Sequence, residues 1–292
     1  MNVHVIHAFL SIQEVQREFN RITEEIRHLD PWLVEDDVTI VYEDWPTLFD
    51  GKSIGFIVDE GSQNCPFCGA HPTEMSIPGR TYTVQDRSRL RYGLTNLHFG
   101  IRILEFMLHV SYMKELRQWM VMKSVPEQVE SHRRRKQLIY DRLFKLYGVR
   151  VDQPRQGGGT SNTGNVARVV FSNPAATAEA LDLPQELIES LALIWRIIRS
   201  PVRIDPQKVR QAQQRFRDVW FSNFVDEKKR SKVKKSARER RQEGISWYYI
   251  PSGVHKVIEH LDEILEVIDI PPGLLSEEGN SCFQMSSCHY YK

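Results

Sequence analysis

The sequence lacks the features that mark membrane-spanning, secreted or disulfide-rich proteins. Its 292 residues contain no apolar run of the roughly 20 residues that a bilayer-spanning helix needs. The first ten residues have no cationic region followed by a long apolar one, so we expect no signal peptide. Four cysteines are too few for a disulfide scaffold, and under reducing conditions a close cysteine pair favours a metal or redox site.

The chain also has almost no net charge, since 39 basic and 38 acidic residues give a formal charge of +1. Only the distribution of charge can therefore indicate a partner. Residues 228–241, KKRSKVKKSARERR, hold nine Lys or Arg and one acid. Such a cluster can bind phosphate backbones through counterion release, serve as a nuclear localisation patch, or form a solvated loop. The candidate DNA contacts in it are Lys228, Lys229, Arg230, Lys234 and Lys235.

Apolar periodicity predicts mostly helices. Spacings of three and four residues predict helices over residues 11–29, 94–119, 129–147, 183–199, 209–224 and 254–268. Two short runs, VTIVY at 38–42 and SIGFIV at 53–58, predict strands. We therefore expect a mixed α/β segment up to about residue 58 and a mostly helical chain after it.

Two residue pairs far apart in the sequence form a candidate metal site. Cys65 and Cys68 offer two thiolates from one turn, and His255 and His260 offer two imidazoles from the end of a helix. Together they make a Cys2His2 set, a common tetrahedral shell for structural zinc. The H-x4-H spacing places the imidazoles about 140° apart around a helix, so local fraying or a helix start is needed there. The alternatives are a free thiol pair in a turn and surface histidines.

These residues belong to a longer ordered series of motifs. The series comprises FDGK at 49–52, QNCPFCGA at 63–70, LHFGIR at 97–102, LHVSY at 108–112, GNVAR at 164–168, WYYIPSGVHKVIEH at 247–260 and LSEEGN at 275–280. In this order the chain resembles the Transib transposases and the catalytic core of the vertebrate V(D)J recombinase, over most of its length.

The resemblance implies a fold class of α/β plus α, a partial RNase H-like core with a large helical, zinc-tied insertion domain. The implied division is a partial RNase H-like α/β segment over residues 1–64, which carries the second catalytic Asp, the insertion domain over 65–270, and a segment over 271–292, which carries the catalytic-type Glu and a divergent tail. The family's active site is a trio of acids, two Asp and one Glu, that holds two Mg²⁺ or Mn²⁺ ions. Asp50 matches the second Asp and Glu278 matches the Glu.

The resemblance also implies DNA contacts, partners and a location. Asn165 and Arg168 match positions near the DNA, and His98 matches a position near the catalytic metals. A satisfied core histidine is the alternative for His98. The implied partners are double-stranded DNA and a second copy of the chain or a polypeptide that supplies a missing N-terminal core. The implied location is the nucleus.

The sequence departs from the family in two places. Only 49 residues precede Asp50, and none of them matches the first Asp of the trio. After Glu278 the chain continues into a tail rich in Ser, Cys and Tyr rather than a charged helix. We therefore expect a transposon-derived DNA-binding protein that cannot cut DNA alone. The alternatives are a fragment of an active DDE endonuclease and strand transferase, and a zinc-stabilised interaction domain without a DNA role.

Overall fold

The computed structural model describes residues 12–30, 32–34, 38–40, 54–55, 57–58, 63–155, 159–226, 245–268 and 270–274. None of the helices in this part of the chain is long and apolar enough to cross a bilayer. The elements are α1 (Ile12–Arg27), β1 (Trp32–Val34), β2 (Val38–Ile40), the 3-10 helix η1 (Arg87–Tyr92), α3 (Asn96–Met113), α4 (Pro126–Tyr147), α5 (Gly164–Val170), α6 (Pro174–Leu181), α7 (Gln185–Ile198), α8 (Pro206–Phe224), β3 (Val225–Asp226), β4 (Ile245–Ser246) and α9 (Ser252–Val267).

The predicted α/β RNase H-like core is wrong, because the described chain is helical. Its described strands form only two antiparallel ribbons of two strands each, β1 with β2 and β3 with β4. The strand predicted over residues 53–58 is also wrong: the Val58 amide donates to the Ile54 carbonyl at 3.0 Å, which is the pattern of a helical turn. A short apolar run satisfies either structure, so periodicity alone could not separate them.

The helices predicted from longer periodic segments are confirmed in α1, α4, α7, α8 and α9. The prediction over residues 94–119 extends too far, since α3 ends at Met113 and Arg117 has a left-handed backbone with φ of 46°. The strand prediction over 38–42 agrees with β2, which pairs with β1. Helix α6 was not predicted, and it is short and rich in alanine.

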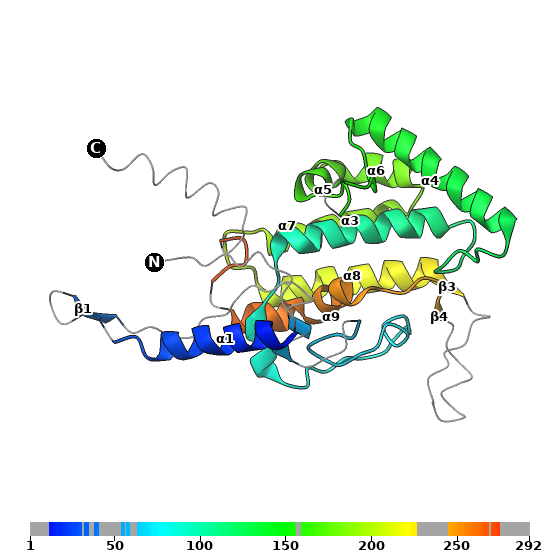
Figure 1. The fold of residues 1–292 in the computed structure, drawn as a ribbon. Helices are drawn as coiled ribbons and strands as arrows, with labels where there is room; N and C mark the ends of the chain where they lie inside the picture. Colours follow the sequence, from blue (N-terminus) through cyan, green and yellow to red (C-terminus); the bar gives the residue numbers. More distant parts are fainter. Residues whose placement is uncertain are drawn as a thin grey trace, which may run out of the picture.

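The helices stack around α3 and α8. Helix α3 contacts α4, α5, α7 and α9, and α8 lies between α7 and α9. Figure 1 shows α8 and α9 side by side, with α4, α5 and α6 grouped at one end of the molecule. A line of aromatic rings fills the inner face of α8, where Trp220 stacks on Phe216 and on Phe224. This buried face fixes α8, and α8 in turn holds α9.

The segment after residue 63 and η1 pack against the outer side of α9. Helix α1 covers η1 through an edge-to-face contact between Phe19 and Tyr92, with ring centroids 5.8 Å apart. The segment is also joined to the β3–β4 ribbon, because the Ser246 amide donates to the Ser76 carbonyl at 3.0 Å. These contacts place the turn that contains Cys65 and Cys68 opposite the first half of α9.

Candidate metal centre

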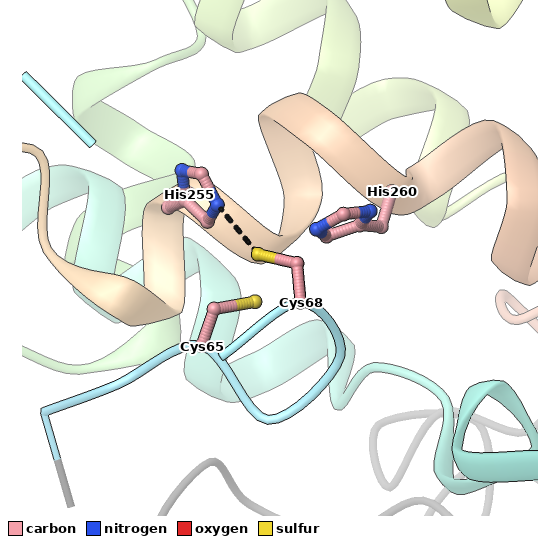
Figure 2. Close-up of side chains that lie close together, drawn as sticks. All are labelled: Cys65, Cys68, His255 and His260. Atoms are coloured by element: carbon pink, nitrogen blue, oxygen red, sulfur yellow. Dashed lines mark hydrogen bonds between the residues drawn. The ribbon is translucent and has the colours of Figure 1, made fainter. Parts of the chain in front are cut away.

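The fold brings the two predicted ligand pairs together. One donor atom from each of Cys65, Cys68, His255 and His260 lies within 4.8 Å of the other three. Figure 2 shows the sulfur of Cys68 between the two imidazole rings, with Cys65 beside it. Cys65, His255 and His260 are buried, and Cys68 is partly exposed. This convergence joins positions that are 187 residues apart in the chain.

Backbone hydrogen bonds shape the cysteine turn. The Cys65 amide donates to the Ala70 carbonyl at 2.9 Å, and the Gly69 amide donates to the Cys65 carbonyl at 2.8 Å. Gly69 has a left-handed φ of 71°, which glycine adopts without strain. Gln85 clamps the turn from outside, since its side-chain amide donates to the Cys68 carbonyl at 3.1 Å. The two thiols therefore leave the turn in a fixed direction toward α9.

The histidines come from the start and the middle of one helix. His255 lies near the N-terminal end of α9, which begins at Ser252, and His260 follows five residues later. The two rings approach each other edge to face, with centroids 5.7 Å apart. Nε2 of His255 lies 3.5 Å from Sγ of Cys68. The turn thus sits against the side of α9 between the two histidine positions, where both imidazoles can reach one sulfur.

Two aromatic side chains fix the imidazole planes. Tyr82 packs edge to face on His255 with ring centroids 4.5 Å apart. Phe67, which lies between the two cysteines, packs in the same way on His260 at 5.8 Å. The Tyr82 hydroxyl donates to the Glu74 carbonyl at 2.6 Å. Both rings are held in place by packing, so little conformational freedom is left to lose on metal binding.

The two thiols titrate as a pair. Burial acts to raise the pKa of Cys65, but hydrogen bonds from the Cys68 side chain and backbone outweigh it and lower that pKa. The hydrogen bond with Cys65, and then burial, raise the pKa of Cys68. Cys68 therefore holds its proton more tightly than Cys65. A metal that binds both sulfurs must displace the thiol protons, so its affinity should fall as the pH falls.

A buried nitrogen without a hydrogen-bond partner is further evidence that these four side chains could bind a metal ion. Nε2 of His260 is fully buried and makes no hydrogen bond within the described part of the chain. A buried polar atom without a partner is costly and needs an explanation. Figure 2 shows the His260 ring with one nitrogen turned toward the cysteine sulfurs. These four residues could hold one metal ion, with Nε2 of His260 as one ligand.

The structure does not add the other predicted site residues to this centre. Asp50, Glu278 and the basic candidates lie outside the described residues. Asn165 is exposed and Arg168 is half-buried on α5. In Figure 1, α5 lies among the upper helices, and the β3–β4 ribbon that flanks the basic segment lies at the right-hand end of α8. The basic candidates outside the described residues are Lys228, Lys229, Arg230, Lys234 and Lys235.

His98 lies on the first turn of α3 and is half-buried. Its Nδ1 is buried without a hydrogen-bond partner among the described residues. The alternative, a core histidine with its hydrogen bonds satisfied, would give this nitrogen a partner, and none lies among the described residues. Its predicted place beside catalytic metals stays a prediction, since Asp50 and Glu278 lie outside the described residues.

The sequence analysis missed the residues that support the ligands. Glu263 lies 3.1 Å from Nδ1 of His260, and Tyr82 and Gln85 hold His255 and the cysteine turn. The sequence carried a signal for Glu263, because an acid three residues after a histidine on a helix lies on the same face. Tyr82 and Gln85 carried no such signal, since their roles depend on how the segment folds back.

Comparison with known proteins adds no assignment: no model of a known protein family matches the chain, and no curated protein matches it. The functional interpretation therefore depends on the chemistry of this centre and on the ordered motifs in the sequence.

Proposed function

We propose that this chain is a transposon-derived, zinc-stabilised DNA-binding protein of the Transib type, without a complete cutting site of its own. The observation that carries the proposal is the convergence of Cys65, Cys68, His255 and His260. The resemblance requires these four residues to meet, although two of them lie 187 residues apart. A chance match of short motifs has no reason to produce that meeting.

The donor set favours zinc among the common metals. Two thiolates and two imidazoles form a soft, nitrogen- and sulfur-rich tetrahedral shell, which zinc prefers over the oxygen ligands of Mg²⁺ or Ca²⁺. In such a shell, neighbouring donors lie about 3.3–3.8 Å apart, and the His255–Cys68 distance of 3.5 Å falls in that range. Four protein donors leave no open position for a substrate, which supports a structural role.

The DNA-binding part of the proposal is supported by the basic segment 228–241. This segment follows β3 and precedes β4, and these two strands pair Val225 with Ser246. Ser246 is hydrogen-bonded to Ser76 in the segment that begins with the cysteine turn. The two strands on either side of the basic segment are therefore attached to the part of the fold that zinc would stabilise. Lys and Arg clusters bind duplex phosphates without sequence preference.

The test is a gel-shift titration of a DNA duplex over a range of salt concentrations. We expect the logarithm of the affinity to fall linearly with the logarithm of the salt concentration. A variant with glutamine at the five basic candidates should have a shallower slope, by about one for each phosphate that the variant no longer neutralises. The control replaces five exposed basic residues outside this segment by glutamine. These are Arg133, Arg134, Lys145, Arg150 and Arg155. The control's slope of log affinity against log salt concentration should stay closer to that of wild type.

The same preparation tests the metal. We expect one zinc per chain by elemental analysis, and His255→Ala should lose both zinc and thermal stability, because ligation energy is folding energy. A wild-type protein without zinc would contradict the proposal. A protein that binds zinc but shows no DNA binding at low salt would instead support an interaction domain without a DNA role.

A further inference from the structure

A carboxylate touches the ligand His260 on the side away from the cysteines. Oε2 of Glu263 lies 3.1 Å from Nδ1 of His260, one helical turn further along α9. His260 is fully buried and the Glu263 side chain is about one-quarter exposed. The contact is therefore largely sheltered from water, where a charged acceptor holds an N–H donor more strongly than at the surface.

The two nitrogens of His260 differ in a way that matches metal ligation. Nδ1 faces the carboxylate, while Nε2 is buried and makes no hydrogen bond within the described chain. A carboxylate acceptor at Nδ1 favours the tautomer with the proton on Nδ1 and leaves the Nε2 lone pair free. That lone pair belongs to the atom that faces the sulfurs in Figure 2.

A second element holds the carboxylate in position. Nη1 of Arg87, in the first turn of η1, lies 3.4 Å from Oε1 of Glu263. Nη2 of the same guanidinium lies 3.6 Å from Oε2 of Glu266. Glu263 thus contacts His260 through one oxygen and Arg87 through the other. The segment that contains the cysteine turn meets α9 a second time at this ion pair.

From this arrangement we infer that Glu263 is a positioning residue for the metal, acting through His260. It fixes the tautomer and the ring orientation of this ligand, and it makes Nε2 a better donor. The inference depends on the zinc part of the proposed function. Outer partners of this kind, when removed, commonly cost about 10- to 100-fold in metal affinity.

The experiment measures the zinc dissociation constant of the full chain by competition with a chromophoric chelator. Glu263→Ala is expected to bind zinc about 10- to 100-fold more weakly than wild type. Glu263→Gln should lose less, because its amide oxygen still accepts from Nδ1 although the charge is gone. Glu266→Ala is the matched control, since Glu266 lies one turn further on α9 and also pairs with Arg87. It should bind zinc as wild type does.

A second readout separates positioning from general destabilisation. Nitrogen-15 NMR of the zinc-free protein should show the Nδ1-protonated tautomer of His260 in wild type and in Glu266→Ala. Glu263→Ala should show a mixture of both tautomers. Unchanged zinc affinity and an unchanged tautomer in Glu263→Ala would overturn the inference while leaving the zinc site intact. A wild-type chain that binds no zinc would overturn the inference together with the proposed function.

Discussion

At the scale of single residues, Asp182 ends α6 and also forms two ion pairs. It ends the helix in a left-handed conformation with φ of 52°, which Asp and Asn tolerate better than most residues. Its carboxylate lies 3.0 Å from Lys114 and 3.0 Å from the buried Arg135. Arg135 belongs to the basic run at 132–136, yet it also donates to the Ser111 carbonyl at 2.9 Å. Asp182 thus joins α6 to both α3 and α4.

These contacts give a pH prediction. Burial acts to raise the pKa of Asp182, but its hydrogen bonds with Lys114 and Arg135 outweigh it and lower that pKa below its usual value. A folded pKa below the unfolded one stabilises the protein above about pH 4, and this stabilisation is lost as the pH falls through the folded pKa. Asp182→Asn, which keeps the left-handed position, should destabilise the protein at pH 7 by at most about 1 kcal/mol, because the side chain is half-exposed.

Urea unfolding of wild type and Asp182→Asn at pH 7 and near pH 3 measures this difference. The two proteins should converge in free energy of unfolding at the lower pH. High salt at pH 7 should also reduce the difference, since a partly exposed ion pair is screened. A difference that is the same at both pH values would show that the charge of Asp182 contributes nothing.

At the scale of elements, the approach of α3 to α7 depends on a glycine. A Cβ added at Gly100 would lie 2.4 Å from the Cζ2 atom of Trp195. Trp195 is buried, and its indole nitrogen donates to Asn96 on α3 at 3.1 Å. The ring cannot move away without breaking this hydrogen bond. Helices α3 and α7 can therefore pack this closely only because residue 100 has no side chain.

Gly100→Ala should consequently destabilise the protein by about 1–3 kcal/mol, the usual cost of overpacking a core. Gly253→Ala is the control, because it adds the same methyl group in α9 at an ordinary 3.8 Å from Arg102. By helix propensity alone it should be neutral or stabilising by up to about 1 kcal/mol. Denaturant unfolding of both variants, under the same metal conditions, measures the contrast. Equal stability of the two variants would mean that Trp195 can shift freely.

The sequence predicted the elements wherever one face of a long helix is apolar. Helices α7 and α8 show this well, since their buried residues recur every three or four positions. It failed at residues 53–58, where six residues are too few to distinguish a strand from a helical turn. It also failed at α6, where alanine leaves little apolar contrast between the faces. The larger error was the RNase H-like core, which the resemblance implied and which only two short apolar runs supported.

Part of the candidate site could be predicted from residue types rather than from periodicity. Cysteine pairs and histidine pairs are distinctive residue types, so Cys65, Cys68, His255 and His260 could be named from the sequence. Their meeting depends on how the segment after residue 63 folds against α9, which no local pattern encodes. The same limit applies to Tyr82, whose ring fixes His255 only because that segment doubles back.

At the scale of the whole molecule, α9 is tied to both η1 and α8. Arg87 of η1 pairs with Glu263 beside the candidate metal centre. Arg210 and Arg217 of α8 pair with Asp262 at 2.6 Å and with Glu259 at 3.0 Å. The acids of α9 are thus paired with arginines from both neighbouring elements. The described part of the chain therefore uses the acids of α9 to hold the fold together.

We predict last that the chain alone will not cut DNA. Within the described residues, the Cys2His2 set is the only group of three or more His, Cys, Asp or Glu side chains placed to share a metal. Its sulfur and nitrogen donors do not suit Mg²⁺, which prefers oxygen. The resemblance matches only Asp50 and Glu278 to the acid trio.

Two carboxylates hold two divalent ions poorly, because the third acid of the trio normally bridges both and offsets their repulsion. Positioning and charge neutralisation supply most of the catalysis in phosphoryl transfer, so most of the rate should be lost with it. The assay incubates supercoiled plasmid with the purified chain in Mn²⁺, beside an Asp50→Ala variant. We expect no nicking above background from either protein. Nicking by wild type that Asp50→Ala abolishes would show instead that another side chain completes the site, and would favour the endonuclease.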